Sequence, residues 1–90
     1  MFANNFTNSL YADAATLLEA QNLSFHLLHP LILETAMKAI ELDPRKVQTG
    51  PAIRSDELTI EKHLHLLESH PEAKKIYQLL TKQIQLQQKD

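Results

Sequence analysis

The stretch Thr49-Gly50-Pro51-Ala52-Ile53-Arg54-Ser55-Asp56 decides the organisation of this chain. It holds the only glycine of the 90 residues and lies between two long segments with helical apolar spacing. Gly50 can adopt a positive φ at no steric cost, and Pro51 disfavours α-helical backbone at the residue before it. We therefore predict a fixed bend here rather than a helix. With no Cβ at the bend, another backbone or a ligand can approach closely.

Two charged residues follow the bend. Arg54 offers a planar five-donor fork that suits a carboxylate or a phosphate, and Asp56 stands where an N-cap is expected before the next periodic segment. The plainer interpretation is a helix connection with a surface Arg–Asp pair, since exposed ion pairs are common and contribute only about 0 to 1 kcal/mol. Both interpretations stay open on these residues alone.

Composition excludes several classes of function. Nine basic and eleven acidic residues give a net charge of −2, which argues against a nucleic-acid partner. The apolar runs are far too short for a membrane span, and we expect no membrane association. The absence of cysteine excludes disulfides and cysteine-ligated zinc and fits a cytoplasmic location. A single glycine leaves no room for a phosphate-binding glycine-rich turn, so we expect no cofactor bound by this chain itself.

The fold class predicted is all-α. No segment alternates with period two, while Leu, Ala, Gln, Glu and Lys dominate. We predict one domain over residues 1–90, a bundle of about four helices. The expected helices cover 3–21, 24–42 with a kink or a new start at Pro30, 56 or 59 to 69, and 71 to the late eighties.

Each expected helix carries an apolar stripe with three- and four-residue steps, and we predict that these stripes form the core. In chain order the stripes are Phe6, Leu10, Ala14, Leu17 and Leu18; Phe25, Leu28, Ile32, Ala36, Ala39 and Ile40; Ile60, Leu64 and Leu67; and Ala73, Ile76, Tyr77, Leu80 and Ile84.

The first helix opens on an unusual run of polar residues, which are mediocre helix formers. In a helix Asn4 and Asn8 are neighbours at i,i+4, and Asn5 and Asn8 are neighbours at i,i+3. Their amides would form one polar strip suited to a ligand. The alternative is a frayed helix end with an asparagine cap.

Three of the five histidines are possible site residues. His26 and His29 share a helix face at i,i+3, but no third ligand accompanies them, so we predict no metal site. His63 lies on the margin of the third apolar stripe, about two turns from Asp56. It is either a partly buried structural histidine or a functional group.

Three motifs together resemble a known family: Ala3-Asn4-Asn5-Phe6-Thr7-Asn8, the stretch 49–56, and Thr59-Ile60-Glu61-Lys62-His63-Leu64. The chain resembles, over its whole length, the helical C-terminal domain of uncharacterised function that follows a Rossmann-like domain in predicted bacterial NAD(P)-dependent oxidoreductases. The family pattern has glycine where this chain has Ser55.

The resemblance implies a wider relation to the helical substrate domains of phosphogluconate dehydrogenase, hydroxyisobutyrate dehydrogenase and ketopantoate reductase. There the helical domain closes a cleft, and a Lys-x-x-Asn-Asn motif supplies a catalytic lysine and amides near the substrate. Asn4 and Asn5 match the amide pair, but Met1 occupies the lysine place. This chain therefore does not supply the motif lysine, and we expect the chain to be a domain of a longer protein.

The resemblance implies a substrate-binding and dimerisation domain that is not catalytic alone, partnered by an N-terminal Rossmann-like domain of the same protein that holds NAD or NADP. A homodimer is expected. Catalytic roles fall to His63, as proton donor, and to Asn5. Substrate binding falls to Asn4, Asn8, Thr49, Gly50, Arg54 and Asp56, and all these residues are expected to converge on one face. The alternative is a stand-alone helical protein-interaction module; a strand, a glycine-rich turn and a helix upstream in the reading frame would exclude it.

Overall fold

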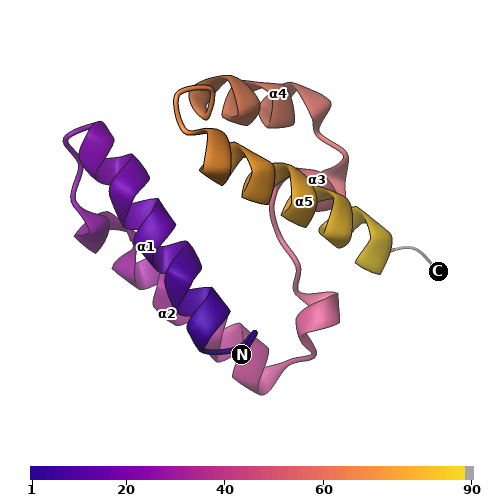
Figure 1. The fold of residues 1–90 in the computed structure, drawn as a ribbon. Helices are drawn as coiled ribbons and strands as arrows, with labels where there is room; N and C mark the ends of the chain where they lie inside the picture. Colours follow the sequence, from indigo (N-terminus) through magenta and orange to yellow (C-terminus); the bar gives the residue numbers. More distant parts are fainter. Residues whose placement is uncertain (89–90) are drawn as a thin grey trace. The chain divides into compact units, whose positions relative to one another are not determined.

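The computed structural model describes residues 1–88, and every regular element in that range is helical (Figure 1). The prediction of an all-α fold is confirmed. The α-helices and the 3-10 turns, in chain order, are α1 Asn5–Ala20, η1 Phe25–Leu28, α2 His29–Glu41, η2 Pro44–Lys46, α3 Pro51–Arg54, α4 Glu57–Leu66 and α5 Pro71–Gln87.

The chain divides into two compact units, Met1–Met37 and a second unit that begins at Lys38. The first unit contains α1, η1 and most of α2. The second contains η2, α3, α4 and α5. The single domain over residues 1–90 stays a prediction, and each unit is described by itself below.

In the first unit, α1 ends in a Schellman motif. Asn22 adopts a left-handed φ of 59°, its N–H bonds to the carbonyl of Glu19 at 3.0 Å, and the N–H of Leu23 bonds to the carbonyl of Leu18 at 2.9 Å. Asparagine tolerates this conformation better than most residues, which explains the stop expected there. The predicted first helix is thus confirmed, one or two residues shorter at each end.

The segment after α1 begins with the expected serine cap. Ser24 accepts a hydrogen bond from the His26 N–H at 3.2 Å, and the one 3-10 turn that follows lies against α1. Tyr11 and Phe25 meet there with their ring centroids 6.5 Å apart. Helix α2 then starts at His29, so that Pro30 lies in its first turn, where a missing N–H costs nothing. The new start expected at Pro30 is confirmed to within one residue.

In the second unit, the loop before α4 contains more helix than the sequence predicted. Asp43 accepts a hydrogen bond from the Arg45 N–H at 2.9 Å and caps η2. Gly50 bends the chain with φ 101° and ψ 175°, and the four residues of α3 follow at once. The prediction of a bend is therefore right for Gly50 and wrong for the residues after it. The reason is that Pro51 takes the first helical position, which proline favours.

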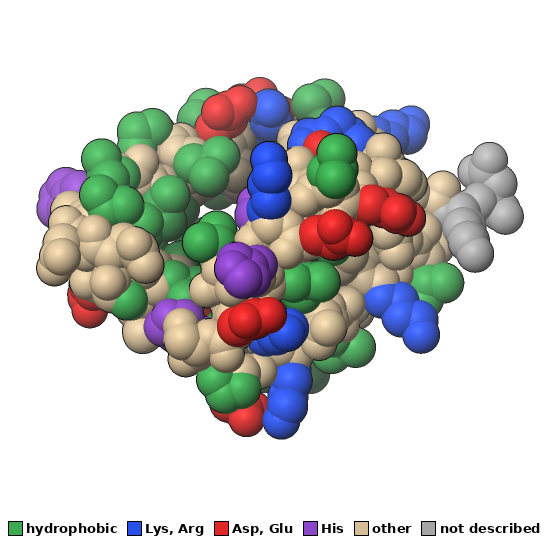
Figure 2. All heavy atoms as spheres, turned by 90° about the horizontal axis from the view of Figure 1, so that it is seen from above, with side chains coloured by type: hydrophobic (Ala, Val, Ile, Leu, Met, Phe, Trp, Pro, Cys, Tyr) green, Lys and Arg blue, Asp and Glu red, His purple; other side chains and the backbone are tan. Residues whose placement is uncertain are grey.

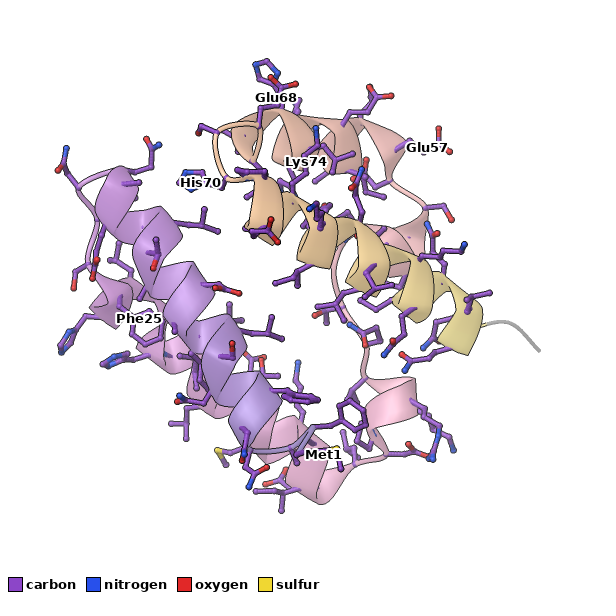
Figure 3. The ribbon with its side chains drawn as sticks, in the orientation of Figure 1. Met1, Phe25, Glu57, Glu68, His70 and Lys74 are labelled. Atoms are coloured by element: carbon purple, nitrogen blue, oxygen red, sulfur yellow. The ribbon has the colours of Figure 1, made fainter. Side chains whose placement is uncertain are left out.

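Helix α3 packs against both α4 and α5. Asp56 is the N-cap of α4 and Pro71 is the first residue of α5, as expected. In Figure 3, Glu57 and Glu68 mark the two ends of the α4 segment, and His70 lies at the turn that leads into α5. The four-residue connection from Leu67 to His70 returns the chain beside α4 with an antiparallel course (Figure 1).

Only two residues in the described range are buried, Ala52 at 6% exposure and Leu67 at 8%. The predicted core is confirmed where α3, α4 and α5 meet, since Ile60, Leu64, Tyr77 and Leu80 are half-buried there. It is wrong for several stripe residues that are exposed: Phe6, Leu10, Ala36, Ala39, Ile40 and Ile76. Periodicity identifies the apolar face of a helix but not what covers that face. Green hydrophobic side chains accordingly lie open to solvent among charged groups in Figure 2.

Candidate functional site

Arg54, Asp56 and Thr59 form a small polar cluster where α3 gives way to α4. Asp56 Oδ1 accepts a hydrogen bond from the Thr59 N–H at 3.2 Å, and Oδ2 accepts one from the Thr59 hydroxyl at 2.8 Å. Arg54 Nη2 lies 3.8 Å from Asp56 Oδ2. Both carboxylate oxygens of Asp56 are therefore engaged by the helix it caps, whereas the half-exposed Arg54 guanidinium keeps most of its donors available.

The same contacts set the titration of Asp56. The hydrogen bonds from the hydroxyl and then the N–H of Thr59 lower the pKa of Asp56 most. Desolvation opposes them, and the charges of Arg54 and Lys62 each lower the pKa by less than desolvation raises it. Donors and cations stabilise the ionised carboxylate. Asp56 is thus an anion across the physiological range and holds Arg54 at the mouth of the loop.

The loop before this cluster is open at its bend. No described atom lies within 4 Å of the position that a Cβ on Gly50 would occupy, so the glycine is required by its φ rather than by crowding. Thr49 is exposed beside it, and its carbonyl accepts a hydrogen bond from Gln48 Nε2 at 3.1 Å. This arrangement leaves space for an incoming group at the bend that the sequence predicted.

Ser55 closes α3 in the left-handed conformation, with φ 53° and ψ 39°. Its N–H bonds to the Ala52 carbonyl at 3.3 Å, and the Asp56 N–H bonds to the Pro51 carbonyl at 2.9 Å. These bonds fix the direction in which α4 leaves the loop. The position has the backbone geometry that glycine adopts most readily.

His63 lies on α4 and is paired with Tyr77 on α5. Its Nδ1 lies 2.8 Å from the Tyr77 hydroxyl oxygen, and the two rings meet edge to face, 5.6 Å between centroids at 87°. Both residues are half-buried. Nδ1 therefore bonds to a side chain and not to the backbone, and the imidazole keeps one edge toward solvent. Sequence reasoning placed Tyr77 in the core stripe and missed this partnership.

A groove of about 370 Å³ runs between α4 and α5 beside that pair. Its apolar floor is made by Ile60, Leu64 and Tyr77, and the polar residues along it are Gln78, Thr81, Lys82 and Gln85. Burial raises the pKa of the Tyr77 phenol, and a hydrogen bond with the Thr81 side chain opposes that rise. The phenol consequently stays protonated and neutral at physiological pH.

The asparagines of the first unit leave their amides exposed. Asn4 is the N-cap of α1 but its side chain makes no cap bond, so the alternative of an asparagine cap is wrong. The helix start is held instead by the Phe6 N–H bonded to the Met1 carbonyl at 3.0 Å and by the Thr7 hydroxyl bonded to the Phe2 carbonyl at 2.5 Å. Within residues 1–88 the side chains of Asn4, Asn5 and Asn8 make no hydrogen bond.

The remaining histidines form no metal centre in the part of the chain that the structure describes, where no three His, Cys, Asp or Glu residues gather as metal ligands do. His26 and His29 stack with their ring centroids 4.3 Å apart, and His65 lies 3.8 Å from Glu68 on the exposed side of α4. None of the described helices is long and apolar enough to cross a membrane.

The structure thus groups the predicted site residues within each unit. Thr49, Gly50, Arg54 and Asp56 follow one another along one loop, and His63 lies two turns into the helix that this loop starts. Asn4, Asn5 and Asn8 share the first two turns of α1. The convergence of the two groups on one face stays a prediction.

Comparison with known proteins gives a family and a structural relative. The model of the family described as "Domain of unknown function (DUF2520)" matches residues 1–84. A crystal structure from Bacteroides fragilis, named "putative NADP oxidoreductase BF3122", is similar with 50% sequence identity and a TM-score of 0.90. The match covers 93% of this chain and 32% of that one, so this chain spans about a third of its relative's length. No curated protein matches.

Proposed function

This chain belongs to the DUF2520 family, and we propose that it is the C-terminal substrate-binding and dimerisation domain of an NAD(P)-dependent oxidoreductase, inactive alone. The observation that carries the proposal is the 50% identity with a named NADP oxidoreductase of which this chain matches only a third. The rest of such a protein would include the Rossmann-like domain, which binds the nicotinamide and supplies the hydride. The relative's name favours NADP over NAD.

The proposed role of this chain is to bind and protonate a polar substrate. A hydride transferred to a carbonyl or imine carbon leaves negative charge that a proton must neutralise. We assign that proton to His63, because histidine is the most common general acid and base in enzymes and this ring is only half-buried. Asn5 would orient the reacting group through its exposed amide, assisted by Asn4 and Asn8, which have no internal hydrogen-bond partner in residues 1–88.

The central loop would hold an anionic part of the substrate. The Arg54 guanidinium keeps free donors for a carboxylate or phosphate, and Asp56 holds it in place from 3.8 Å. Gly50 and Thr49 would let the substrate approach the backbone, because the space before Gly50 is open. In this proposal Asp56 takes part in substrate binding through Arg54.

Turnover of the full-length parent tests these roles, measured as NADPH consumption with a panel of small 2-oxo acids, ketones and imines. We expect His63→Gln to lower turnover about a hundredfold, the usual contribution of a positioned proton donor, and Asn5→Ala and Arg54→Ala to lower it without unfolding the domain. His65→Gln is the matched control, since His65 is a histidine of the same helix with an 81% exposed side chain. Equal turnover in the His63 and His65 variants would remove His63 from the mechanism.

Dimerisation is supported by the apolar side chains on the second unit. Leu58, Leu66 and Leu79 are 66 to 73% exposed on α4 and α5, more apolar surface than an isolated helical unit normally presents. A second copy of the chain or the rest of the parent protein would cover it. The same observation favours the second candidate, a helical interaction module, which an upstream reading frame without a Rossmann-like domain would support.

A further inference from the structure

Tyr77 is the structural partner of the proposed proton donor. We propose that Tyr77 is a positioning residue that occupies Nδ1 of His63 and so leaves Nε2 as the ring nitrogen that exchanges the proton with the substrate. This inference rests on the proposed function, in which His63 transfers a proton. It adds the residue that orients the ring and the atom from which the proton leaves.

The contacts with Tyr77 restrain the imidazole ring of His63 more than is usual for a side chain on a surface helix. The hydrogen bond joins two helices across fourteen residues of sequence, at 2.8 Å from His63 Nδ1 to the Tyr77 hydroxyl. The near-perpendicular rings add an edge-to-face contact that resists rotation of either side chain. Tyr77 is itself held in the floor of the groove by Ile60 and Leu64. The orientation of His63 is therefore set from α5 and not from its own helix.

The second ring nitrogen of His63, Nε2, is available to bind a group from outside residues 1–88. Nε2 makes no hydrogen bond to any of residues 1–88, although the ring is only half-buried. A histidine whose Nδ1 is engaged by a fixed oxygen presents Nε2 in one defined direction, which is the arrangement that proton transfer requires.

Tyr77 can satisfy the ring while it is charged. In the imidazolium, Nδ1–H donates to the Tyr77 hydroxyl oxygen. In the parent protein, where a bound nicotinamide would supply the hydride, the Nε2–H bond of His63 would break and its proton would form a bond to the substrate oxygen or nitrogen. The ring is left neutral with its hydrogen on Nδ1, still bonded to Tyr77. Tyr77 remains neutral throughout, because the pKa of a phenol is ordinarily far above neutral and burial raises the pKa of Tyr77 further.

A hydrogen bond that only joins α4 to α5 would show the same distance, so the test needs a readout of the ring itself. We would record the ring nitrogen resonances of the protein labelled with ¹⁵N-histidine, and His63→Gln would assign the signals of His63 among the five histidines. The variant is Tyr77→Phe, which keeps the packed ring and removes the hydroxyl. Tyr11→Phe is the control, since the Tyr11 ring packs on Phe25 and its hydroxyl makes no hydrogen bond in residues 1–88.

We expect Tyr77→Phe to move the Nδ1 resonance of His63 toward that of a freely exchanging imidazole, and Tyr11→Phe to leave it in place. Unchanged Nδ1 resonances in folded Tyr77→Phe would overturn the inference. Thermal melting of each variant checks that the fold is retained.

Turnover of the full-length parent separates this inference from the proposed function. Loss of one neutral hydrogen bond predicts a three- to tenfold lower turnover in Tyr77→Phe, about the rate equivalent of a single net hydrogen bond. If His63→Gln lowers turnover and Tyr77→Phe does not, the positioning role is wrong and the proton-transfer role stands. If His63→Gln has full turnover, both are wrong.

Discussion

At Gly50 and Ser55 the backbone takes φ angles of 101° and 53°, and only the first of these positions carries the residue best suited to it. The backbone of the central loop is therefore unstrained at Gly50 and strained at Ser55, where the side chain disfavours the left-handed conformation. Ser55 therefore carries a conformational cost that glycine at the same position would not.

Ser55→Gly is expected to stabilise the protein. A left-handed conformation destabilises the folded state by about 1 to 2 kcal/mol for a non-glycine residue, and glycine removes that cost. Glycine also gives the unfolded chain more conformational freedom, which offsets about 0.4 to 1 kcal/mol of the gain. The net gain should be about 0.5 to 1 kcal/mol, measured by urea unfolding. Ser69→Gly, outside any left-handed position, is the control and should not stabilise the protein. A less stable Ser55→Gly variant would show that the Ser55 hydroxyl matters more than its backbone angle.

Asp56 gives a prediction about pH. Its pKa is lowered in the folded state, so its carboxylate contributes stability that is present above the ordinary pKa of an aspartate and is lost as pH falls through the lower folded-state pKa. Asp56→Asn keeps an acceptor for the cap but removes the charge. We expect the protein to be more stable than this variant at neutral pH and the difference to vanish in strong acid.

The control for that comparison is Asp13→Asn on α1, away from any helix cap. Thermal melts across the acidic range give the measurement. A difference between the protein and Asp56→Asn that does not change with pH would mean that the carboxylate charge contributes nothing through Thr59 and Arg54.

The sequence predicted the roles of Asp56 and Asn22 correctly because each residue starts or ends a helix through hydrogen bonds to backbone groups three or four residues away. It missed Tyr77 as the partner of His63 for the opposite reason. That bond depends on how α4 and α5 lie against each other, and helical periodicity shows only that both residues border an apolar stripe. The pairing of side chains fourteen residues apart is a product of tertiary packing.

Among the elements, α3 is the instructive case. Four residues are too few to show helical periodicity, and a glycine followed by proline is typical of a turn. The turn is real, but Pro51 also starts a helix well, and burial of Ala52 where α3 contacts α4 and α5 stabilises that single turn. The longer helices were predictable in type and extent because caps and stripes coincide at their ends.

Leu67 and Leu66 test the packing of these elements directly. Leu67, at the end of α4, is 8% exposed, whereas its neighbour Leu66 is 68% exposed. Leu67→Ala should destabilise the protein by about 2 to 3 kcal/mol, through lost burial and the cavity left behind. Leu66→Ala should change stability by less than about 0.5 kcal/mol in the isolated chain. Equal losses in urea unfolding would contradict the packing described for α4.

Over the described residues, few hydrophobic side chains are buried and many are exposed to solvent. Sixteen large hydrophobic side chains are exposed while only Ala52 and Leu67 are buried. The sequence predicted the apolar stripes, but a stripe does not reveal whether its cover is another helix, a second copy or a further domain. The site shows the same limit, since its loop and its asparagines could be named from motifs, whereas their predicted convergence on one face depends on how the two units lie and stays a prediction.

Self-association follows from this exposed surface. We expect the 90-residue chain to sediment as a dimer at high micromolar concentration and to dissociate on dilution, because each buried Å² of apolar surface contributes about 25 cal/mol. Sedimentation equilibrium over a concentration series gives the measurement. A monomer throughout would mean that a different chain or domain covers the apolar faces of α4 and α5.

The central claim is that this chain is one domain of an NAD(P)-dependent oxidoreductase whose cofactor is bound elsewhere in the protein. Calorimetric titration of NADPH tests it most directly, into the 90-residue chain and into the full-length parent. We expect no measurable heat of binding with the chain, which has no glycine-rich turn leading into a helix, and micromolar affinity with the parent. Micromolar binding by the chain alone, or no binding by the parent, would contradict the account.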